Sequence, residues 1–167
     1  MNQLTICKIE KNLLNLILIF SGAAILICIY LIYQHYKIDI GAICNINDFL
    51  NCDKVNKSIY SEFLNVPVSI WGILSYILIF IVSILFFNKF DFKNIHHGLT
   101  NRTVLVFIML FSLFGVLFSL YLSYAELFIL NAVCIFCLAQ QILIILITLC
   151  FYLIFRHSRV IGCTYFK

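Results

Sequence analysis

The sequence predicts an all-α integral membrane protein: a four-transmembrane-helix bundle with a short amphipathic helix in its first outer loop. Of the 167 residues, 64% are hydrophobic and 11% are charged, whereas soluble domains are about half apolar and about a quarter charged. Four apolar stretches without a charged residue approach the roughly 20 residues that a helix needs to cross the hydrocarbon core. The sequence lacks the alternating short strands of a membrane β-barrel, so a helical bundle is the expected spanning structure.

The four expected spans follow the apolar runs, at about 13–33, 68–87, 104–123 and 132–155. The first run is longer than the apolar region of a cleavable signal peptide, and its small residues lie in its middle rather than at its end. We therefore expect a retained anchor and a single membrane domain over residues 1–167.

The outer loop between the first two spans, about residues 34–66, is long for a helix–helix connection. Val55, Ile59 and Phe63 recur at every fourth position. This spacing is typical of a short amphipathic helix that lies on the bundle or on the membrane surface. Pro67 suits the first position of the span that follows.

Positive charges set the expected orientation, since Lys and Arg concentrate in the cytoplasmic segments of membrane proteins. With the N-terminus inside, eight of them fall in inner segments: Lys8, Lys11, Lys89, Lys93, Arg102, Arg156, Arg159 and Lys167. Three fall in outer segments: Lys37, Lys54 and Lys57. Both termini are therefore expected in the cytoplasm.

This orientation predicts which of the eight cysteines lie near the outer face of the membrane. Four lie near the outer face, where an oxidising compartment allows disulfides to persist: Cys44 and Cys52 in the outer loop, Cys134 and Cys137 at the start of the fourth span. The charge count does not use the cysteines, so their common side is independent support for it. The other four are expected to be small core residues or reduced bystanders: Cys7, Cys28, Cys150 and Cys163.

The pair Cys134 and Cys137 has the spacing of a dithiol on one helix face. A helix N-terminus favours a thiolate, so Cys134 is expected to be the more acidic and accessible thiol. Cys137 lies one turn deeper, nearer a membrane-embedded acceptor. A zinc half-site or a chance pair are the alternatives, but the oxidising side and the presence of His35 as the sole outer histidine argue against zinc. We expect no metal.

The loop pair, Cys44 and Cys52, is separated by eight positions with polar residues between. It is either a static structural disulfide or a shuttle pair. We favour the shuttle, in which one cysteine meets a partner protein and the other passes the disulfide to Cys134. Such exchange requires a thiolate to attack a disulfide, and a flexible loop serves it well.

These residues together resemble the vitamin K epoxide reductase family, whose members are helical-bundle thiol–quinone oxidoreductases. The matching motif residues, in order and spacing, are Cys44, Cys52, Ser58 and Cys134-x-x-Cys137. The stretch 66–72 also looks like the start of the family's second helix. The resemblance covers roughly 44–72 and 134–141, together with the layout of four spans.

The resemblance implies a role for each motif residue. Cys44 resembles the loop cysteine that exchanges with a thioredoxin-like partner. Cys52 resembles the cysteine that forms an interloop disulfide with Cys134. Cys137 resembles the cysteine that reduces the quinone, and Ser58 resembles the hydroxyl beside the quinone ring.

Two positions depart from the vertebrate members, which carry an Asn where this chain has Val68 and a Tyr where it has Gln141. These departures suit a bacterial-type member that reduces a respiratory quinone, ubiquinone or menaquinone, rather than vitamin K epoxide. We expect a member without a fused thioredoxin-like domain, and the resemblance then implies a separate thioredoxin-like (DsbA-like) partner. The implied location is a bacterial inner membrane, with the redox cysteines on its outer side.

Two further residues are candidates for contact with the quinone. Gln141 lies at i+4 from Cys137, and its amide either bonds a quinone carbonyl or links two helices. Gln140 is the weaker candidate. Trp71 is expected to be an interfacial anchor that could also cover a quinone.

We therefore expect a membrane thiol–quinone oxidoreductase that reoxidises a secreted thioredoxin-like protein and so supports disulfide formation. A DsbB-like oxidase fits less well, because its CxxC lies in the first outer loop. The alternative from another class is a non-catalytic membrane protein with a structural outer disulfide or a cysteine metal site. The expected partners are the lipid bilayer, the quinone and the thioredoxin-like protein, and not a nucleic acid.

Overall fold

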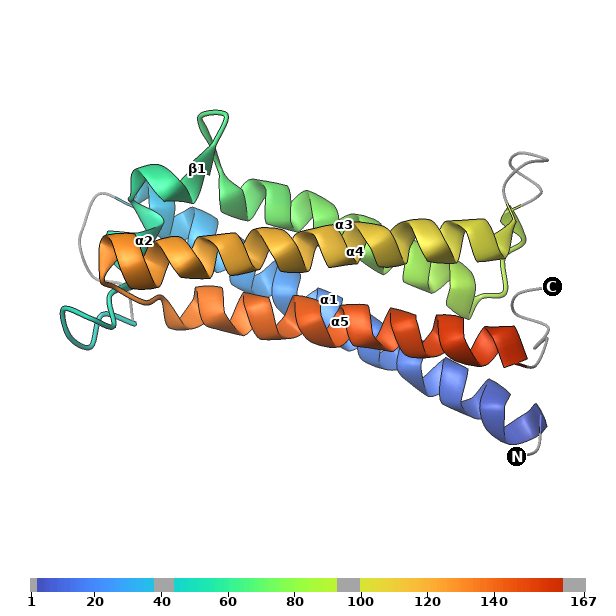
Figure 1. Cartoon of the computed structure of the whole chain (residues 1–167). Helices are drawn as coiled ribbons and strands as arrows, with labels where there is room; N and C mark the ends of the chain where they lie inside the picture. The colour runs from blue at the N-terminus through green and yellow to red at the C-terminus, as the bar shows by residue number, and fades with distance from the viewer. Residues whose placement is uncertain (1–2, 38–43, 93–99, 161–167) are drawn as a thin grey trace.

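The computed structural model describes residues 3–37, 44–92 and 100–160. Four long helices run along one another in these parts of the chain (Figure 1): α1 (Gln3–Tyr36), α3 (Val68–Phe87), α4 (Asn101–Tyr124) and α5 (Ile135–Val160). All four are long and apolar enough to cross a membrane. The predicted four-span helical bundle is therefore confirmed.

The helices pack in a definite order. α1 contacts both α3 and α5, and α5 also contacts α4. The core between them is built from side chains that are almost fully enclosed, such as Ile17, Ile79, Leu105 and Ile147. α3 and α4 lack a comparably extensive contact with each other, and this difference leaves room for the cavity described below.

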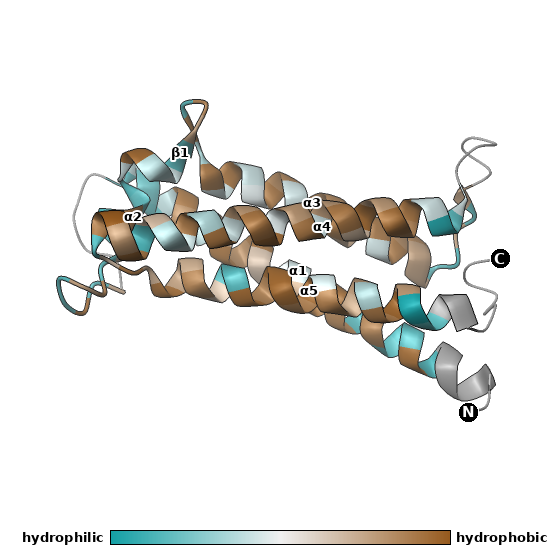
Figure 2. Cartoon of the chain, in the orientation of Figure 1, coloured by the Kyte–Doolittle hydropathy of each residue, from teal (hydrophilic) through white to brown (hydrophobic). Residues whose placement is uncertain are grey.

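The outside of the bundle is apolar as well. Figure 2 shows hydrophobic residues along the middle of the helices and hydrophilic residues toward both ends. Leu26, Phe107 and Phe114 are each more than two-thirds exposed. So many exposed apolar side chains on four spanning helices are explained by contact with lipid, and the chain is a multi-pass membrane protein.

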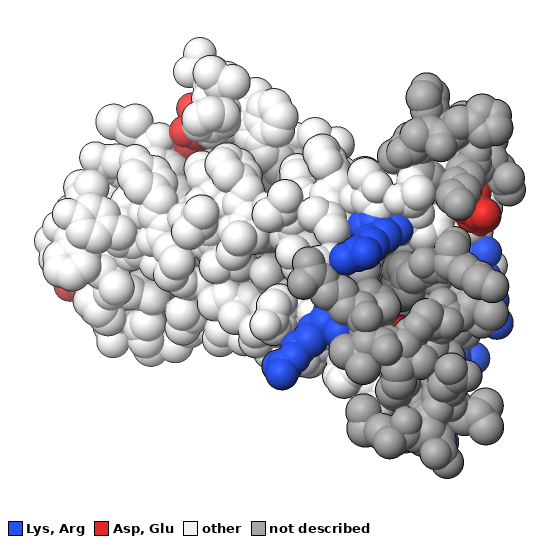
Figure 3. All heavy atoms as spheres, turned by 45° about the vertical axis from the view of Figure 1, so that its right-hand side comes forward, with Lys and Arg blue, Asp and Glu red and all other residues white. Residues whose placement is uncertain are grey.

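One end of the bundle carries most of the Lys and Arg residues of the described part of the chain. The start of α1 and the end of α5 both lie at this end (Figure 1), and Figure 3 shows Lys and Arg side chains gathered near it on the face drawn. The exposed basic residues of the described inner segments are Lys8, Lys11, Lys89, Arg102 and Arg156. Lys93, Lys167, Cys163 and the pair His96-His97 lie outside the described residues, as do the side chains of Arg159 and Cys7.

The first loop, residues 44–67, lies at the opposite end. It contains α2 (Cys52–Asn56), the 3-10 turn η1 (Ile59–Ser61) and a two-stranded antiparallel hairpin of β1 (Glu62–Phe63) and β2 (Val66–Pro67). The hairpin turns at Leu64 and Asn65, which have φ of 57° and 60°. Left-handed conformation at both central residues matches the twist of a tight hairpin.

The predicted short helix in this loop is present, but it ends at Asn56. Val55 is buried, whereas Ile59 and Phe63 are 91% and 51% exposed, so the expected apolar stripe is not continuous. The Ser58 hydroxyl explains the early end, because it donates to the Val55 carbonyl at 2.7 Å. A serine that bonds a nearby carbonyl competes with the helical backbone.

The remaining helix ends also differ from the expected bounds. α4 continues into η3 (Ala125–Leu130), a π-helical turn, so the third span reaches about seven residues beyond Ser123. α5 starts at Ile135 rather than Ala132. Pro67 precedes α3 as its N-cap and pairs in β2, instead of occupying the first helical position.

Candidate active site

Three sulfur atoms meet at the loop end of the bundle. Cys44 and Cys52 are joined by a disulfide with their Cα atoms 5.8 Å apart. The Cys134 thiol donates a hydrogen bond to Cys52 Sγ at 3.0 Å. All three residues are buried. The structure therefore brings together three of the four cysteines that the sequence singled out.

Backbone pairing holds the loop against the residue before Cys134. Val133 N–H donates to the Phe49 carbonyl at 2.7 Å, and Asn51 N–H donates to the Val133 carbonyl at 3.2 Å. Leu50 and Val133 thus form a parallel bridge. Because Cys52 and Cys134 follow these paired residues directly, the bridge sets the distance between their sulfurs.

Side chains fix Cys52 from its other side. Asn51 caps α2 by accepting from Lys54 N–H at 3.0 Å, which is a common way to satisfy a helix N-terminus. Asn45 donates to the Asp53 carboxylate at 2.6 Å and accepts from Asp53 N–H at 3.3 Å. These two bonds hold the residue after Cys44 against the residue after Cys52.

Cys134 is the N-cap of α5, since its carbonyl accepts from Leu138 N–H at 3.0 Å. A hydrogen bond from the Cys137 thiol lowers the pKa of Cys134 from its usual value, and backbone N–H groups of Cys137 and Phe136 act in the same direction. This is how an N-cap side chain is normally stabilised. The direction agrees with the expected acidity of Cys134.

The expected accessibility of Cys134 is not observed. Cys134 is fully buried beneath the loop disulfide, whereas Cys137 is partly exposed and faces a cavity. The two thiols of the CxxC therefore have different neighbours beyond each other. One contacts the loop, and the other contacts the interior space between the helices.

The cavity has a volume of about 500 Å³. Side chains of α3 and α4 line its two flanks, while α1, α5 and the first loop contribute the rest of its wall. The wall is mostly apolar, with a few polar groups that include Ser58, Glu126 and Gln140. An apolar cavity with few polar groups is typical of a site for a small organic ligand.

Two of the predicted ligand contacts lie on this cavity. Trp71 lines it, donates to the Phe63 carbonyl at 3.4 Å and meets the Phe63 ring edge-on. Ser58 lines it as well, and its hydroxyl is held by the Val55 carbonyl. Both residues are therefore fixed by the first loop at the wall of the cavity.

The two neighbouring glutamines have different surroundings. Gln141 accepts from Ser123 Oγ on α4 at 2.5 Å, which is the helix-linking arrangement, and it is not among the residues lining the cavity. Gln140 lines the cavity and donates to the Ala24 carbonyl at 2.8 Å. Its Oε1 is buried without a hydrogen-bond partner among the described residues.

Glu126 is a residue of this site that the sequence reasoning missed. Its carboxylate accepts from Cys134 N–H at 3.2 Å, and it is buried. The third span was expected to end at about Ser123, so Glu126 lay beyond its expected end. A carboxylate only eight residues before the CxxC, at the edge of an apolar run, was the signal that could have found it.

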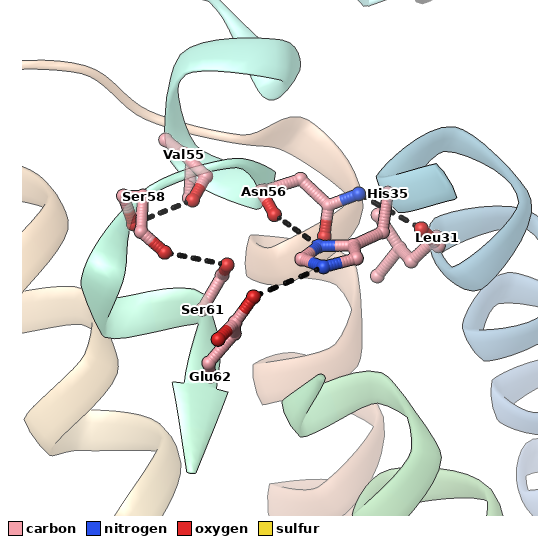
Figure 4. A network of polar contacts seen from close by, with 7 residues as sticks. All are labelled: Leu31, His35, Val55, Asn56, Ser58, Ser61 and Glu62. Carbon is pink, nitrogen blue, oxygen red and sulfur yellow. Dashed lines mark hydrogen bonds and ion pairs between the residues drawn. The ribbon is translucent and has the colours of Figure 1, made fainter. Parts of the chain in front are cut away.

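A polar network ties the first loop to the end of α1 (Figure 4). His35 donates from Nδ1 to the Asn56 carbonyl at 2.6 Å, and its Nε2 lies 3.4 Å from the Glu62 carboxylate. Asn56 in turn donates to the Leu31 carbonyl at 2.8 Å. The network closes the loop over the end of the cavity where Ser58 lies.

The sulfurs of Cys44, Cys52 and Cys134 lie within 4.8 Å of one another, a spacing that would also suit a metal. In this state, however, two of the three are bonded to each other, and a metal ligand must be a free thiolate. The donor set as it stands fits disulfide exchange rather than metal binding.

A disulfide in contact with a reduced CxxC, set at the end of four membrane spans, defines a membrane thiol–disulfide oxidoreductase. The sequence comparison gives the family. The model of the vitamin K epoxide reductase family matches residues 15–153, so the chain belongs to that family. Among curated proteins, none matches the chain.

Proposed function

We propose that this protein takes electrons from a separate thioredoxin-like protein and passes them to a quinone, thereby supporting disulfide formation. One observation carries the proposal: the Cys134 thiol touches Cys52 of the loop disulfide at 3.0 Å, while Cys137 lines the cavity. The four sulfurs thus form a continuous path from the loop to a space suited to a small apolar ligand.

The loop pair exchanges with the partner. A thiolate of the partner attacks Cys44, and the partner's second thiol then resolves the mixed disulfide. The partner leaves oxidised, and Cys44 and Cys52 become thiols. Because Cys44 is 4% exposed, the segment that carries it must move for this attack to occur.

The CxxC then reoxidises the loop. A Cys52 thiolate attacks the Cys134–Cys137 disulfide and releases Cys137, after which Cys44 attacks Cys52 and releases Cys134. The loop disulfide is restored, and Cys134 and Cys137 are both reduced. The structure has this distribution, with a loop disulfide and two free CxxC thiols.

The dithiol finally reduces the quinone. Two S–H bonds break, the Cys134–Cys137 disulfide forms, and the quinone gains two electrons and two protons to become the quinol. Ser58 and Trp71 are proposed to contact the ring, and the free Oε1 of Gln140 can accept from a quinol hydroxyl. Gln141 is proposed to act through Ser123, which also lines the cavity. Ubiquinone or menaquinone is the proposed acceptor.

The proposed setting is a bacterial inner membrane with both termini in the cytoplasm. The gathering of Lys and Arg at the end where α1 starts and α5 ends (Figure 3) supports this orientation. It places the first loop and the CxxC on the oxidising side, where a secreted partner can reach them.

The test is a steady-state assay with a reduced thioredoxin-like protein and quinone in a bilayer. Cys137→Ala should abolish quinol formation, since the cavity then lacks its thiol. Cys150→Ala is the matched control, because Cys150 lies on the same helix and is buried in the core away from the cavity. Equal rates for Cys137→Ala and the unmodified protein would contradict the proposal.

A further inference from the structure

Glu126 lies where the dithiol and the cavity meet. Its carboxylate accepts from Cys134 N–H at 3.2 Å, and its side chain also interacts with that of Cys137. The same residue lines the cavity. One carboxyl group therefore contacts both members of the CxxC and reaches the space proposed for the quinone.

The backbone around Glu126 is arranged for this position. η3 is a π-helical turn, a feature that is frequent at functional sites. Its carbonyl at Glu126 accepts from Ala132 N–H at 3.1 Å, and Asn131 ends the turn with φ of 46°. The wider turn rotates Glu126 toward the start of α5 instead of leaving it on the outer surface of α4.

A purely structural role for Glu126 would explain only its contact with Cys134 N–H. An amide oxygen could accept from Cys134 N–H as well as a carboxylate does, and at a smaller desolvation cost. A carboxyl group inside an apolar bundle is expensive and is by default a sign of function. Unlike Ser58 and Gln140, Glu126 has a carboxyl group, which can take up and release a proton.

We propose that Glu126 carries protons from the Cys134–Cys137 dithiol to the quinone, an inference that rests on the proposed function. The carboxylate accepts the proton of the Cys137 thiol. Glu126 gives this proton to one quinone oxygen and then accepts the proton of the Cys134 thiol. Two electrons pass to the quinone as the Cys134–Cys137 bond forms, and Glu126 delivers the second proton to the other quinone oxygen, so that it returns to the carboxylate.

Other titratable groups face the same space and belong in any pH analysis. Those that line the cavity come from four elements: Cys28 of α1, Tyr60 of η1, Tyr76 of α3 and Cys137 of α5. Across the sulfur cluster, α2 contributes Cys52 and Asp53. The CxxC meets the Glu126 carboxyl through Cys134, whose backbone N–H donates to it, and through the side chain of Cys137.

The test is the single-turnover rate of quinol formation by the pre-reduced protein across a pH series. Glu126→Gln keeps an acceptor for Cys134 N–H but cannot carry a proton, and it should lower the rate by about 10²- to 10⁴-fold. In the unmodified protein the rate should fall in acid as the carboxylate is protonated. Glu126→Gln should lack that fall, whereas Glu126→Asp should be slower but retain it.

Glu10→Gln is the matched control, because Glu10 is also a buried carboxyl but lies in the core near the other end of α1. It should leave the rate and its pH profile unchanged. If Glu126→Gln matched the unmodified protein, or if Gln and Asp variants lost the same rate with an unaltered profile and an intact loop disulfide, the inference would be wrong. An unmodified protein that forms no quinol would overturn the proposed function as well.

Discussion

Cys52 and Cys134 are 82 positions apart in the chain, yet their sulfur atoms lie 3.0 Å from each other. The contact depends on the bridge between Leu50 and Val133, which aligns the loop with the start of α5. Disulfide exchange requires close approach of a thiolate to a disulfide sulfur, and Cys134 already holds that position toward Cys52.

Removal of Cys137 should trap the exchange at this contact. In Cys137→Ser, the Cys134 thiolate can still attack Cys52, but Cys137 is no longer present to release it, and only the freed Cys44 can reverse the exchange. We expect a Cys52–Cys134 disulfide and a free Cys44 in most molecules. Peptide mapping under non-reducing conditions detects this link, and its absence from a folded Cys137→Ser protein would argue against the relay.

The rate of this trapping should depend on pH through Cys134. The Cys137 thiol, by its hydrogen bond, lowers the pKa of Cys134 from its usual value. The attacking form is the thiolate, so the rate should fall as pH drops through this lowered pKa. Cys137→Ser retains a hydrogen-bond donor and Cys137→Ala does not, and the midpoint of the rate should therefore lie at higher pH in the Ala variant. Equal pH midpoints in the two variants would show that the Cys137 hydrogen bond is not what lowers the pKa of Cys134.

The network around His35 should stabilise the first loop mainly through one bond. His35→Ala removes the 2.6 Å contact with the Asn56 carbonyl and should cost about 1 kcal/mol of local stability. The contact with Glu62 is half-exposed, so Glu62→Gln should cost less than about 1 kcal/mol. Hydrogen exchange of the α2 amides measures both, and a larger effect of Glu62→Gln would show that the ion pair dominates.

Substitutions of Gln140 and Gln141 should have different effects: the first on the KM for quinone, the second on the stability of the protein. Gln140→Leu removes the free Oε1 from the cavity and should raise KM for quinone. Gln141→Leu removes the bond with Ser123 and should lower stability by about 0.6–1.7 kcal/mol, as for other hydrogen bonds between membrane helices. Quinone titrations and thermal unfolding measure the two effects. The reverse pattern would assign the quinone contact to Gln141.

The spans and the sulfur pairs could be predicted because their signals are local. Apolar runs of spanning length predict the four helices. The count of Lys and Arg in each segment predicts that the two cysteine pairs lie on the same side of the membrane. The start of α5 could not be predicted in this way, since Val133 continues the apolar run in sequence but pairs with Leu50 in space.

Helical spacing in the sequence does not determine which polar side chains line the cavity. Gln140 and Gln141 lie at i+3 and i+4 from Cys137, and both spacings place a residue on the same side of a helix. The choice between them follows from where α4 and α1 pack. Glu126 was missed because the π-helical η3 extends the third span beyond its apolar run.

The most direct measurement is a single turnover of the pre-reduced protein with quinone, followed by mapping of its disulfides. The account predicts one quinol for each Cys134–Cys137 disulfide formed, with the Cys44–Cys52 disulfide retained. Quinol formation without a new bond between Cys134 and Cys137, or formation of that bond without quinol, would contradict it.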